Sequence, residues 1–344
     1  MMAAEEYYIF TGREAVPPDV TRVRIDKSIS VIPARAFYNH PNIIELDCHI
    51  DVKKVERYAI YHCHSLRRVI MPGVKEVEGY AFFGCYALTD VECNKLEIIR
   101  GYVFTNCNSL RSINLPSIKI VEGYAFISCI ALANVKFGDK LESIGGRAFF
   151  ACNSLERITL PLKDGTISDD AFQRCGNLKR VNLVEGSILH QTIDALLLEE
   201  WRNDMRRNID AIKQILSNGP ADGDGYEDVG GGGKTEAIRT WIRSVLRKIV
   251  HYKSHHHRYL NEAAATLELA LWKKRLSEIN IPEGDDEDEG RAKCRVKCGA
   301  DIVMKNVLPF LELPPYTFEW RIREGGRRHE EEGNVLYSFF GVDL

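Results

Sequence analysis

The chain has 344 residues, of which 45% are hydrophobic and 28% charged, a balance typical of a globular protein with about two domains. Its formal net charge of −3 lacks the basic excess of a nucleic-acid-binding surface, so we expect no nucleic-acid partner. The sequence contains no apolar run of roughly 18 residues, which a transmembrane helix requires, and we expect no membrane partner.

The N-terminal segment, residues 1–19, does not look like a secretory signal. Glu5 and Glu6 stand where a signal peptide is basic, and no apolar core segment follows them. We therefore expect a cytoplasmic protein, with the nucleus as an alternative. The ten cysteines do not change this expectation, because their spacing follows a repeat rather than the framework of a small disulfide-linked domain.

Residues 20–186 contain a repeat of 22 or 23 residues, visible as columns of similar residues. The first column is aromatic or apolar and consists of Phe37, Ile60, Phe82, Phe104, Phe126, Phe149 and Phe172. The second lies three residues later and consists of His40, Cys63, Cys85, Cys107, Cys129, Cys152 and Cys175. Because one coil of this length cannot bury its apolar side, we expect stacked coils whose columns form continuous ridges inside the core.

Each copy also contains a short stretch in which apolar and polar residues alternate. Val69 and Met71 alternate with Arg68 and Ile70, which predicts a strand with the first pair facing in and the second facing out. Inward residues repeat and outward residues vary, as expected of a selective binding face, although drift on an unused surface would look alike. The predicted partner-binding residues are Arg68, Ile70, Asp90, Glu92, Ser112, Asn114, Asn134, Lys136, Arg157, Thr159, Arg180 and Asn182.

The pattern Ala-Phe-x-x-Cys-x-x-Leu-x-x-Val/Ile, often followed by proline, resembles the BspA-like class of leucine-rich repeats over about residues 20–185. The resemblance implies a right-handed, sheet-lined β-solenoid, here of about seven coils, in a mixed fold with a mostly helical C-terminal region. It also implies a non-catalytic protein that binds other proteins. Members are often adhesins or surface proteins, so a secreted or surface structural protein is the alternative to an intracellular scaffold.

The cysteine column could suggest disulfides or a metal site. A ladder with residues about 4.8 Å apart does not place four ligands around one point, as structural zinc requires. We therefore expect half-buried thiols at a tight corner, facing backbone groups, and no metal or other cofactor. One question stays open, because His40, His62, Cys63 and His64 could gather near the first coils and hold a metal.

A column of tyrosines stands two residues before the first column, at Tyr58, Tyr80, Tyr102 and Tyr124. Stacked tyrosines could form a recognition strip, because aromatic side chains give contact area at low entropic cost. They could equally shield the edges of the coils against one another. The sequence leaves both interpretations open.

The C-terminal half changes to helical spacing from Ile188. Residues 187–218 are predicted to form an amphipathic helix that covers the last coil, which needs a cap. Residues 219–233 are acidic and glycine-rich, which indicates a flexible linker. A long helix is expected from about residue 235 to 279, interrupted near His255. We expect the two long helices to pair as an antiparallel hairpin and to dock on the solenoid.

The remaining predictions complete the helical region, residues 234–313. It includes an acidic loop at 283–290 and a shorter helix over about 292–311, and an irregular tail follows at 314–344. The stretches 241–249 and 306–314 resemble a module that follows such repeats in some microbial eukaryotes and has no assigned activity. Arg239, Arg243 and Lys248 make the long helix basic, which we attribute to docking rather than to a separate calmodulin-like or membrane target.

Two motifs in this half could carry chemistry. Gly233-Lys234-Thr235 ends like a phosphate-binding loop, but Asp228 takes the place of its first glycine and no buried strand precedes it. Nucleotide binding there is a remote alternative. The long helix contains four histidines, His251, His255, His256 and His257. The first two have the i,i+4 spacing of zinc helices without the catalytic glutamate, so a solvated basic face is favoured for the four. We predict no catalytic residues and no enzymatic activity.

Overall fold

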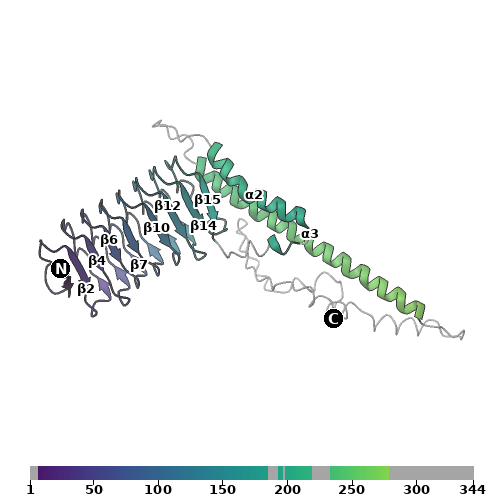
Figure 1. Cartoon of the computed structure of the whole chain (residues 1–344), viewed down its shortest axis with the longest axis horizontal. Helices are drawn as coiled ribbons and strands as arrows, with labels where there is room; N and C mark the ends of the chain where they lie inside the picture. The colour runs from purple at the N-terminus through teal and green to yellow at the C-terminus, as the bar shows by residue number, and fades with distance from the viewer. Residues whose placement is uncertain (1–6, 185–192, 197, 219–232, 279–344) are drawn as a thin grey trace, which may run out of the picture. The chain divides into compact units, whose positions relative to one another are not determined.

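The computed structural model describes residues 7–184, 193–196, 198–218 and 233–278 (Figure 1). The chain divides into two compact units, Met1–Glu262 and Ala263–Leu344. The first unit contains the repeat, which forms a β-solenoid of about seven turns as expected, followed by helices. Among the described residues, neither long helix combines the length and the apolar character that crossing a membrane demands.

Each coil places one strand on a broad face of the solenoid, here called the strand face. Five of these strands form one parallel sheet: β1 (Tyr8–Phe10), β2 (Arg22–Ile25), β4 (Glu45–Asp47), β6 (Arg68–Ile70) and β8 (Asp90–Glu92). Four form a second parallel sheet: β10 (Ser112–Leu115), β12 (Asn134–Phe137), β14 (Arg157–Leu160) and β15 (Arg180–Leu183). From β2 onward, paired residues of these strands lie 22 or 23 positions apart in the sequence, so equivalent positions of successive coils lie side by side.

A second set of two-residue strands lines another side of each coil. It forms one parallel sheet from β3 (Val31–Ile32), β5 (Lys54–Val55), β7 (Glu76–Val77), β9 (Ile98–Ile99), β11 (Ile120–Val121) and β13 (Ser143–Ile144). Charged residues directly before these strands pair between coils, and the carboxylate of Glu97 lies 3.3 Å from the ammonium of Lys75 and 2.7 Å from that of Lys119. We call this side the short-strand flank.

The first column forms the centre of the core, as predicted. All seven members are buried, and the phenyl rings stack along the solenoid. The ring of Phe104 lies 5.3 Å from that of Phe82 and 5.1 Å from that of Phe126. This spacing matches the distance between neighbouring strands, so the stacking of coils brings the rings together.

The tight corner around this column has an unusual backbone. In most coils the residues two before and two after the first column have positive φ, and few of them are glycine. Tyr80, Tyr102 and Tyr124 adopt φ values of 63°, 61° and 60°. The corner is held by a ladder of its own, in which the Phe104 N–H donates to the Ala125 carbonyl of the next coil at 2.7 Å. Each such hydrogen bond needs a following coil to accept it.

Two long helices follow the repeat within the described ranges. Helix α2 (Glu199–Asn218) begins later than residue 187, and residues 185–192 lie outside the described part of the chain. Helix α3 (Gly233–Glu278) is continuous, so the predicted interruption near His255 is wrong. Residues 234–278 contain neither proline nor glycine, and histidine disfavours helix only mildly. Gly233 begins α3 rather than ending the linker.

Helices α2 and α3 pack against each other in opposite directions, as the hairpin prediction requires. Trp241 Nε1 donates to the Asn208 carbonyl at 2.9 Å, and further along α3 the ammonium of Lys248 lies 2.7 Å from Asp204. Tyr252 also donates to Asp204, at 2.8 Å. The rest of the predicted linker, the acidic loop 283–290, the helix over 292–311 and the tail 314–344 lie outside the described residues.

Candidate functional site: the strand face and its flanks

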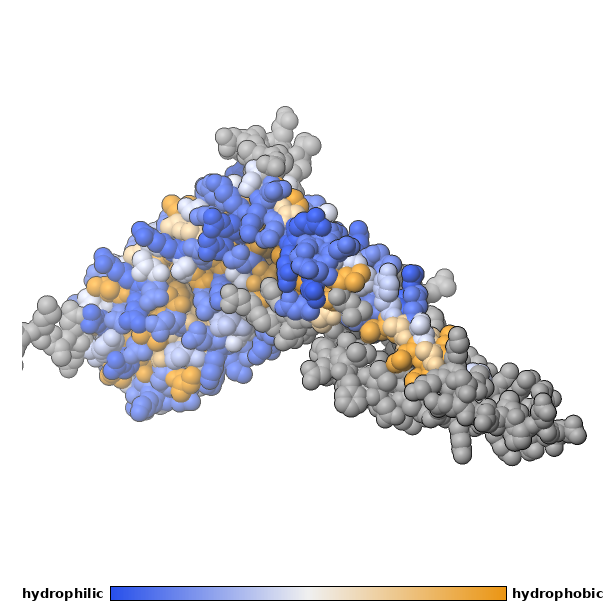
Figure 2. Space-filling model, turned by 45° about the vertical axis from the view of Figure 1, so that its right-hand side comes forward, coloured by the Kyte–Doolittle hydropathy of each residue, from blue (hydrophilic) through white to orange (hydrophobic). Residues whose placement is uncertain are grey.

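The strand face places the predicted partner-binding residues as the alternation implied. None of the twelve is buried, and most are exposed. They form two rows, because parallel pairing aligns Ser112 with Asn134 and Asn114 with Lys136. On the side shown in Figure 2 the described surface of the solenoid is largely hydrophilic, with apolar residues in scattered spots. A partner that lies on such a surface meets polar and charged groups.

Outward residues of the first coils also belong to this face, and the repeat-based prediction left them out. Arg22 and Arg24 on β2 lie beside Glu45 and Asp47 on β4, with Arg24 Nε 2.9 Å from Asp47. Their alternation with Val23 and Leu46 was a usable signal. Arg22 and Arg24 belong to an entry coil that is too degenerate to align with the columns. Glu45 and Asp47 flank Leu46, which follows Phe37 by the same nine residues that separate Val69 from Ile60, so the repeat did indicate these two.

Cross-strand ion pairs join most charges in the five-stranded part of the face. Arg68 lies 3.3 Å from Asp90 and 2.6 Å from Glu92, both on the next strand. Hydrogen bonding to Glu92 and the nearby carboxylates raise the pKa of Arg68 above its ordinary value. All three side chains stay exposed to water, so this pairing organises the surface more than it stabilises the fold.

The tyrosine column forms a continuous stack. Ring centroids are 5.1 Å apart from Tyr58 to Tyr80, 4.9 Å from Tyr80 to Tyr102 and 5.0 Å from Tyr102 to Tyr124. The rings are nearly parallel and half-buried, so their faces cover one another and their edges are left for any ligand. Burial raises the pKa of Tyr102, so its hydroxyl stays protonated.

A second aromatic row, which the sequence analysis missed, runs beside the first. The ring of Tyr61 stacks between those of Tyr38 and Phe83 at 5.0 and 5.1 Å, and it meets Tyr58 edge-on at 5.4 Å. These residues follow the first column by one position, where three successive early coils have aromatic residues and only Phe150 does so in the later coils. The two rows together give the N-terminal coils an aromatic corner.

The cysteine column is scaffold. Each of its six thiols donates to the carbonyl of a first-column residue in the preceding coil, and the Cys107 Sγ to Phe82 O distance is 3.3 Å. The side chains are fully buried, not half-buried as expected, because the next coil covers each corner. Burial raises the pKa of Cys63 to about 12 and that of Cys85 well above its ordinary value.

The four residues of the open metal question do not come together as a ligand set. His40 Nε2 lies 2.8 Å from the Pro17 carbonyl, and Cys63 faces the core, where it donates to Phe37. His62 stacks on Tyr61 and lies 5.2 Å from His64. Within the described ranges, no group of three or more histidine, cysteine or acidic side chains could hold a metal ion.

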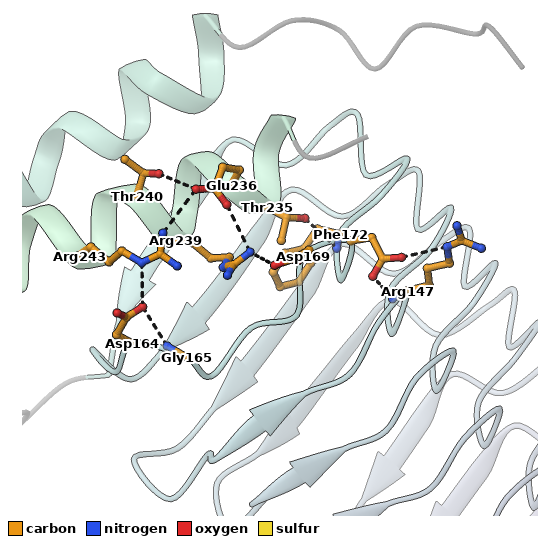
Figure 3. Close-up of polar contacts among 11 residues, drawn as sticks. Arg147, Asp164, Gly165, Asp169, Phe172, Thr235, Glu236, Arg239, Thr240 and Arg243 are labelled. Carbon is orange, nitrogen blue, oxygen red and sulfur yellow. Dashed lines mark hydrogen bonds and ion pairs between the residues drawn. The ribbon is translucent and has the colours of Figure 1, made fainter. Parts of the chain in front are cut away.

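Lys234 and Thr235 bind backbone groups of the last coil, and Figure 3 shows the contact of Thr235 with Phe172. The Phe172 N–H, which has no following coil, donates to Thr235 Oγ1 at 3.1 Å. The ammonium of Lys234 donates to the carbonyls of Gly176 and Leu178, the latter at 3.0 Å. Both capping side chains are buried, Thr235 with 1% of its surface exposed.

Arginines of α3 form ion pairs with the end of the solenoid beside this cap. Docking therefore explains part of the basic character of α3. Arg239 pairs with Asp169, and Arg243 Nε lies 3.2 Å from Asp164 (Figure 3). Further along, His256 is buried with 7% exposure, so a solvated face is wrong for this residue. Burial, and to a lesser degree the neighbouring His257, lowers the pKa of His256.

Several solved structures are similar to part of this chain. The structure resembles the leucine-rich repeat protein of T. pallidum (23% identity, 46% of this chain, 68% of that one, TM-score 0.36). It also resembles a leucine-rich cell surface protein from Faecalibacterium prausnitzii (19% identity, 49% of this chain, 80% of that one, TM-score 0.20). The pneumococcal vaccine antigen PcpA is similar too (17% identity, 52% of this chain, 54% of that one, TM-score 0.33), so the chain spans about half the length of PcpA. The search of curated proteins found no match.

The sequence itself supplies the assignment to a family. The family described as "BspA type Leucine rich repeat region" matches in six copies, over residues 18–108 and 75–195. Together these matches span just over half of the 344 residues. The chain therefore belongs to the BspA-type leucine-rich repeat proteins.

Proposed function

We propose that this protein is a non-catalytic scaffold that binds another protein through the strand face of its solenoid. The observation that carries the proposal is the contrast between a regular backbone and varied outward side chains. Strands in register present two rows of outward residues whose chemistry changes from coil to coil. A rigid sheet with individual side chains can match one partner closely at little entropic cost.

The size of the face supports this role. Nine strands about 4.8 Å apart extend over roughly 38 Å. A standard protein interface buries about 800 Å² on each partner, which a surface of this length can supply. Repeat solenoids commonly use such extended surfaces for binding.

Proximity labelling in cells that express the full chain tests the proposal. One variant carries Glu92→Ala, Asn114→Ala and Lys136→Ala on the strand face. A matched variant carries Lys75→Ala, Glu97→Ala and Lys119→Ala on the short-strand flank. We expect a specific partner to disappear with the first variant and to persist with the second, while both keep the wild-type circular dichroism spectrum. Undiminished labelling of the same partner by the strand-face variant would refute the proposal.

The tyrosine stack is the second candidate surface. Its exposed ring edges, together with the exposed Tyr38, offer amphipathic contacts beside Arg57, which lies 5.0 Å from the Tyr58 ring centre. The same labelling experiment with Tyr80→Ala and Tyr102→Ala distinguishes the two surfaces. Loss of the partner with this variant alone would assign recognition to the aromatic corner.

We place the scaffold inside the cell, in the cytoplasm or the nucleus. The cysteine ladder supports this location, because six thiols serve as hydrogen-bond donors and must stay reduced to do so. The alternative is a secreted or surface protein with a structural or adhesive role. Cell fractionation combined with glycosidase treatment separates the two, since glycosylated protein in the medium or on the surface would support the alternative.

Nucleotide binding at Gly233-Lys234-Thr235 stays the remote alternative. The capping contacts of Lys234 and Thr235 argue against it, since both groups would have to leave the last coil to reach a phosphate. A melting temperature that does not move at millimolar ATP and Mg²⁺ would remove this alternative.

A further inference from the structure

We propose that the four-stranded part of the strand face, formed by β10, β12, β14 and β15, binds an acidic segment of the partner protein. This inference rests on the proposed function and narrows it to one part of the face and one partner chemistry. We call this part the cationic half.

The charged outward residues of the cationic half all have the same sign. Lys136, Arg157 and Arg180 are cations, and the other five outward residues, which are neutral and polar, are Ser112, Asn114, Asn134, Thr159 and Asn182. The charged residues directly before these strands, all exposed, are Arg111, Glu156 and Lys179, so they add two cations and one anion and raise the positive excess by one. The five-stranded part instead mixes both signs, with each arginine in an ion pair across the strands.

Two of the cations face each other directly. Arg157 and Arg180 are register partners on β14 and β15, which puts their Cα atoms about 4.8 Å apart. Like charges in this arrangement repel and destabilise a sheet. The Nε atom of Arg157 is buried and has no hydrogen-bond partner in the described structure. Across the described residues, none of the three cations forms an ion pair.

A carboxylate from a partner would offset the repulsion between the two arginines. It could accept from the two guanidinium groups at once, replace repulsion with attraction and supply planar, bidentate hydrogen bonds. Lys136 lies in the second row, aligned with Thr159, and thus about two residues further along the strand direction than Arg157. Two residues of extended chain cover about 6.6 Å, so a segment with acids at alternate positions can reach both sites.

Amides and a hydroxyl surround the cations and favour a peptide over a purely electrostatic ligand. Asn134 and Asn182 are exposed and Thr159 is half-buried between the charges, and all three can bond to the backbone of a bound segment. Three cations without an exposed aromatic ring among them are few for a nucleic acid, which needs more phosphate contacts for affinity. The expected ligand is an extended acidic segment of a protein.

Fluorescence anisotropy on the full-length protein tests the inference. The probe is a fluorescein-labelled peptide of alternating glutamate and serine, and the control probe carries glutamine in place of glutamate. At low salt we expect the wild type to prefer the glutamate peptide by at least tenfold. The variant K136Q/R157Q/R180Q should lose that preference, and the matched variant R22Q/R24Q/R68Q on the five-stranded part should keep it.

Thermal unfolding checks that the loss is not a folding defect. Removal of two opposed arginines relieves repulsion, so the melting temperature of K136Q/R157Q/R180Q should equal or exceed that of the wild type. A lower melting temperature together with lost binding would point to a structural role and overturn the inference. Equal affinity for both peptides in the wild type, or tighter binding of single-stranded DNA at the same ionic strength, would overturn it as well.

The acidic run Asp285–Glu289 of the same chain is the competing occupant. A variant with these five acids changed to Asn and Gln tests it. If this variant binds the glutamate peptide and the wild type does not, and if R157Q abolishes that binding, the cationic half binds the chain's own acidic run. That result would overturn the inference of a separate partner. No binding in either background would also refute the inference. Failure of this inference does not by itself refute the proposed function. If substitutions in the five-stranded part still abolish proximity labelling of the partner, the strand face remains the binding surface.

Discussion

Neighbouring residues on a single strand of this solenoid lie in opposite environments. Val135 and Ile158 are buried and match each other from coil to coil, whereas Asn134 and Arg157, one residue earlier in each strand, are outward and unlike. The buried residue must fit against the same position of two neighbouring coils, so stacking restricts it to one shape and polarity. The outward residue also lies beside its counterparts in the neighbouring coils, but its side chain extends into water, so packing does not restrict its shape or polarity. Selection for binding can therefore act on the outward rows without disturbing the fold.

The last coil differs from the interior coils because no further coil of the described chain is present to complete its hydrogen bonds. In the interior, the N–H of Phe149 donates to Ala171 of the following coil at 3.0 Å, but Phe172 has no following coil and uses Thr235 instead. The carbonyl of Asn153 accepts from the next coil through Asn177 at 2.6 Å. Its counterpart in the last coil accepts from Lys234. Two side chains at the start of α3 thus replace the hydrogen bonds of a missing coil.

The largest effect on stability should come from the buried first column. We expect Phe104→Ala to lower the free energy of unfolding by about 3–5 kcal/mol, because it removes a ring packed between two others and leaves a cavity. Chemical denaturation followed by circular dichroism measures the change, and Phe104→Leu, which keeps most of the volume, should cost clearly less. A loss below about 1 kcal/mol would show that this column does not carry the core.

The cap should contribute less, but measurably. Lys234→Met keeps the length of the side chain and removes its hydrogen bonds to Gly176 and Leu178, which should cost about 1–3 kcal/mol. Limited proteolysis should detect earlier cleavage near β15, and thermal unfolding gives the size of the effect. Lys213→Met, at an exposed site of α2, is the matched control. If both variants melt alike, the capping contacts do not hold the end of the solenoid.

The buried thiols should contribute about 1 kcal/mol each through their hydrogen bonds to backbone carbonyls. Cys107→Ala removes such a donor, whereas Cys107→Ser keeps one directed at the Phe82 carbonyl and should cost less than Ala. Denaturant midpoints of the two variants provide the comparison. A serine variant less stable than the alanine variant would show that apolar packing of sulfur, rather than donation, matters at this corner.

The same thiols predict a dependence on pH. Burial raises the pKa of Cys63 to about 12, above that of a thiol in the unfolded chain, so the folded state keeps the neutral form. This contribution is complete below the unfolded pKa and is lost as the pH rises toward the folded value. Iodoacetamide at pH 8.5 followed by mass spectrometry should leave the six column thiols unmodified until denaturant is added. Rapid native alkylation of Cys63 would contradict their burial.

The repeat makes the interior of the solenoid predictable from sequence. Stacking requires the same residue type at each 22- or 23-residue step. The periodicity alone therefore predicts that Phe104 and Cys107 lie in the core, each beside its counterparts in the neighbouring coils. Alternation within a strand then identifies the outward rows. Local propensity fails where tertiary packing decides, as at Tyr80 and Tyr102, which adopt positive φ that tyrosine does not favour in isolation.

The sequence does not show which side chains complete the hydrogen bonds of the last coil, for a different reason. Lys234 and Thr235 follow four glycines and look locally like a phosphate-binding loop, while the groups they bind lie more than fifty residues earlier in the chain. No local pattern records that separation. The buried His256 is a similar case, because His255 is half-buried and His257 is exposed, and only packing distinguishes His256 from them. The continuity of α3 was misjudged because a cluster of histidines resembles an interruption without containing a helix breaker.

The smallest effect on stability should come from the outward rows. Asn114→Ala and Asn134→Ala, alone or combined, should change the free energy of unfolding by no more than about 0.5 kcal/mol, because both side chains are exposed and neither is needed for stacking. Denaturation under the conditions used for Phe104→Ala provides the measurement, so the two kinds of position are compared on one scale. Labelling of a partner by the double variant should nevertheless fall. Should the double variant lose more than about 1 kcal/mol, these outward residues would serve the fold, and their variation could not be attributed to binding.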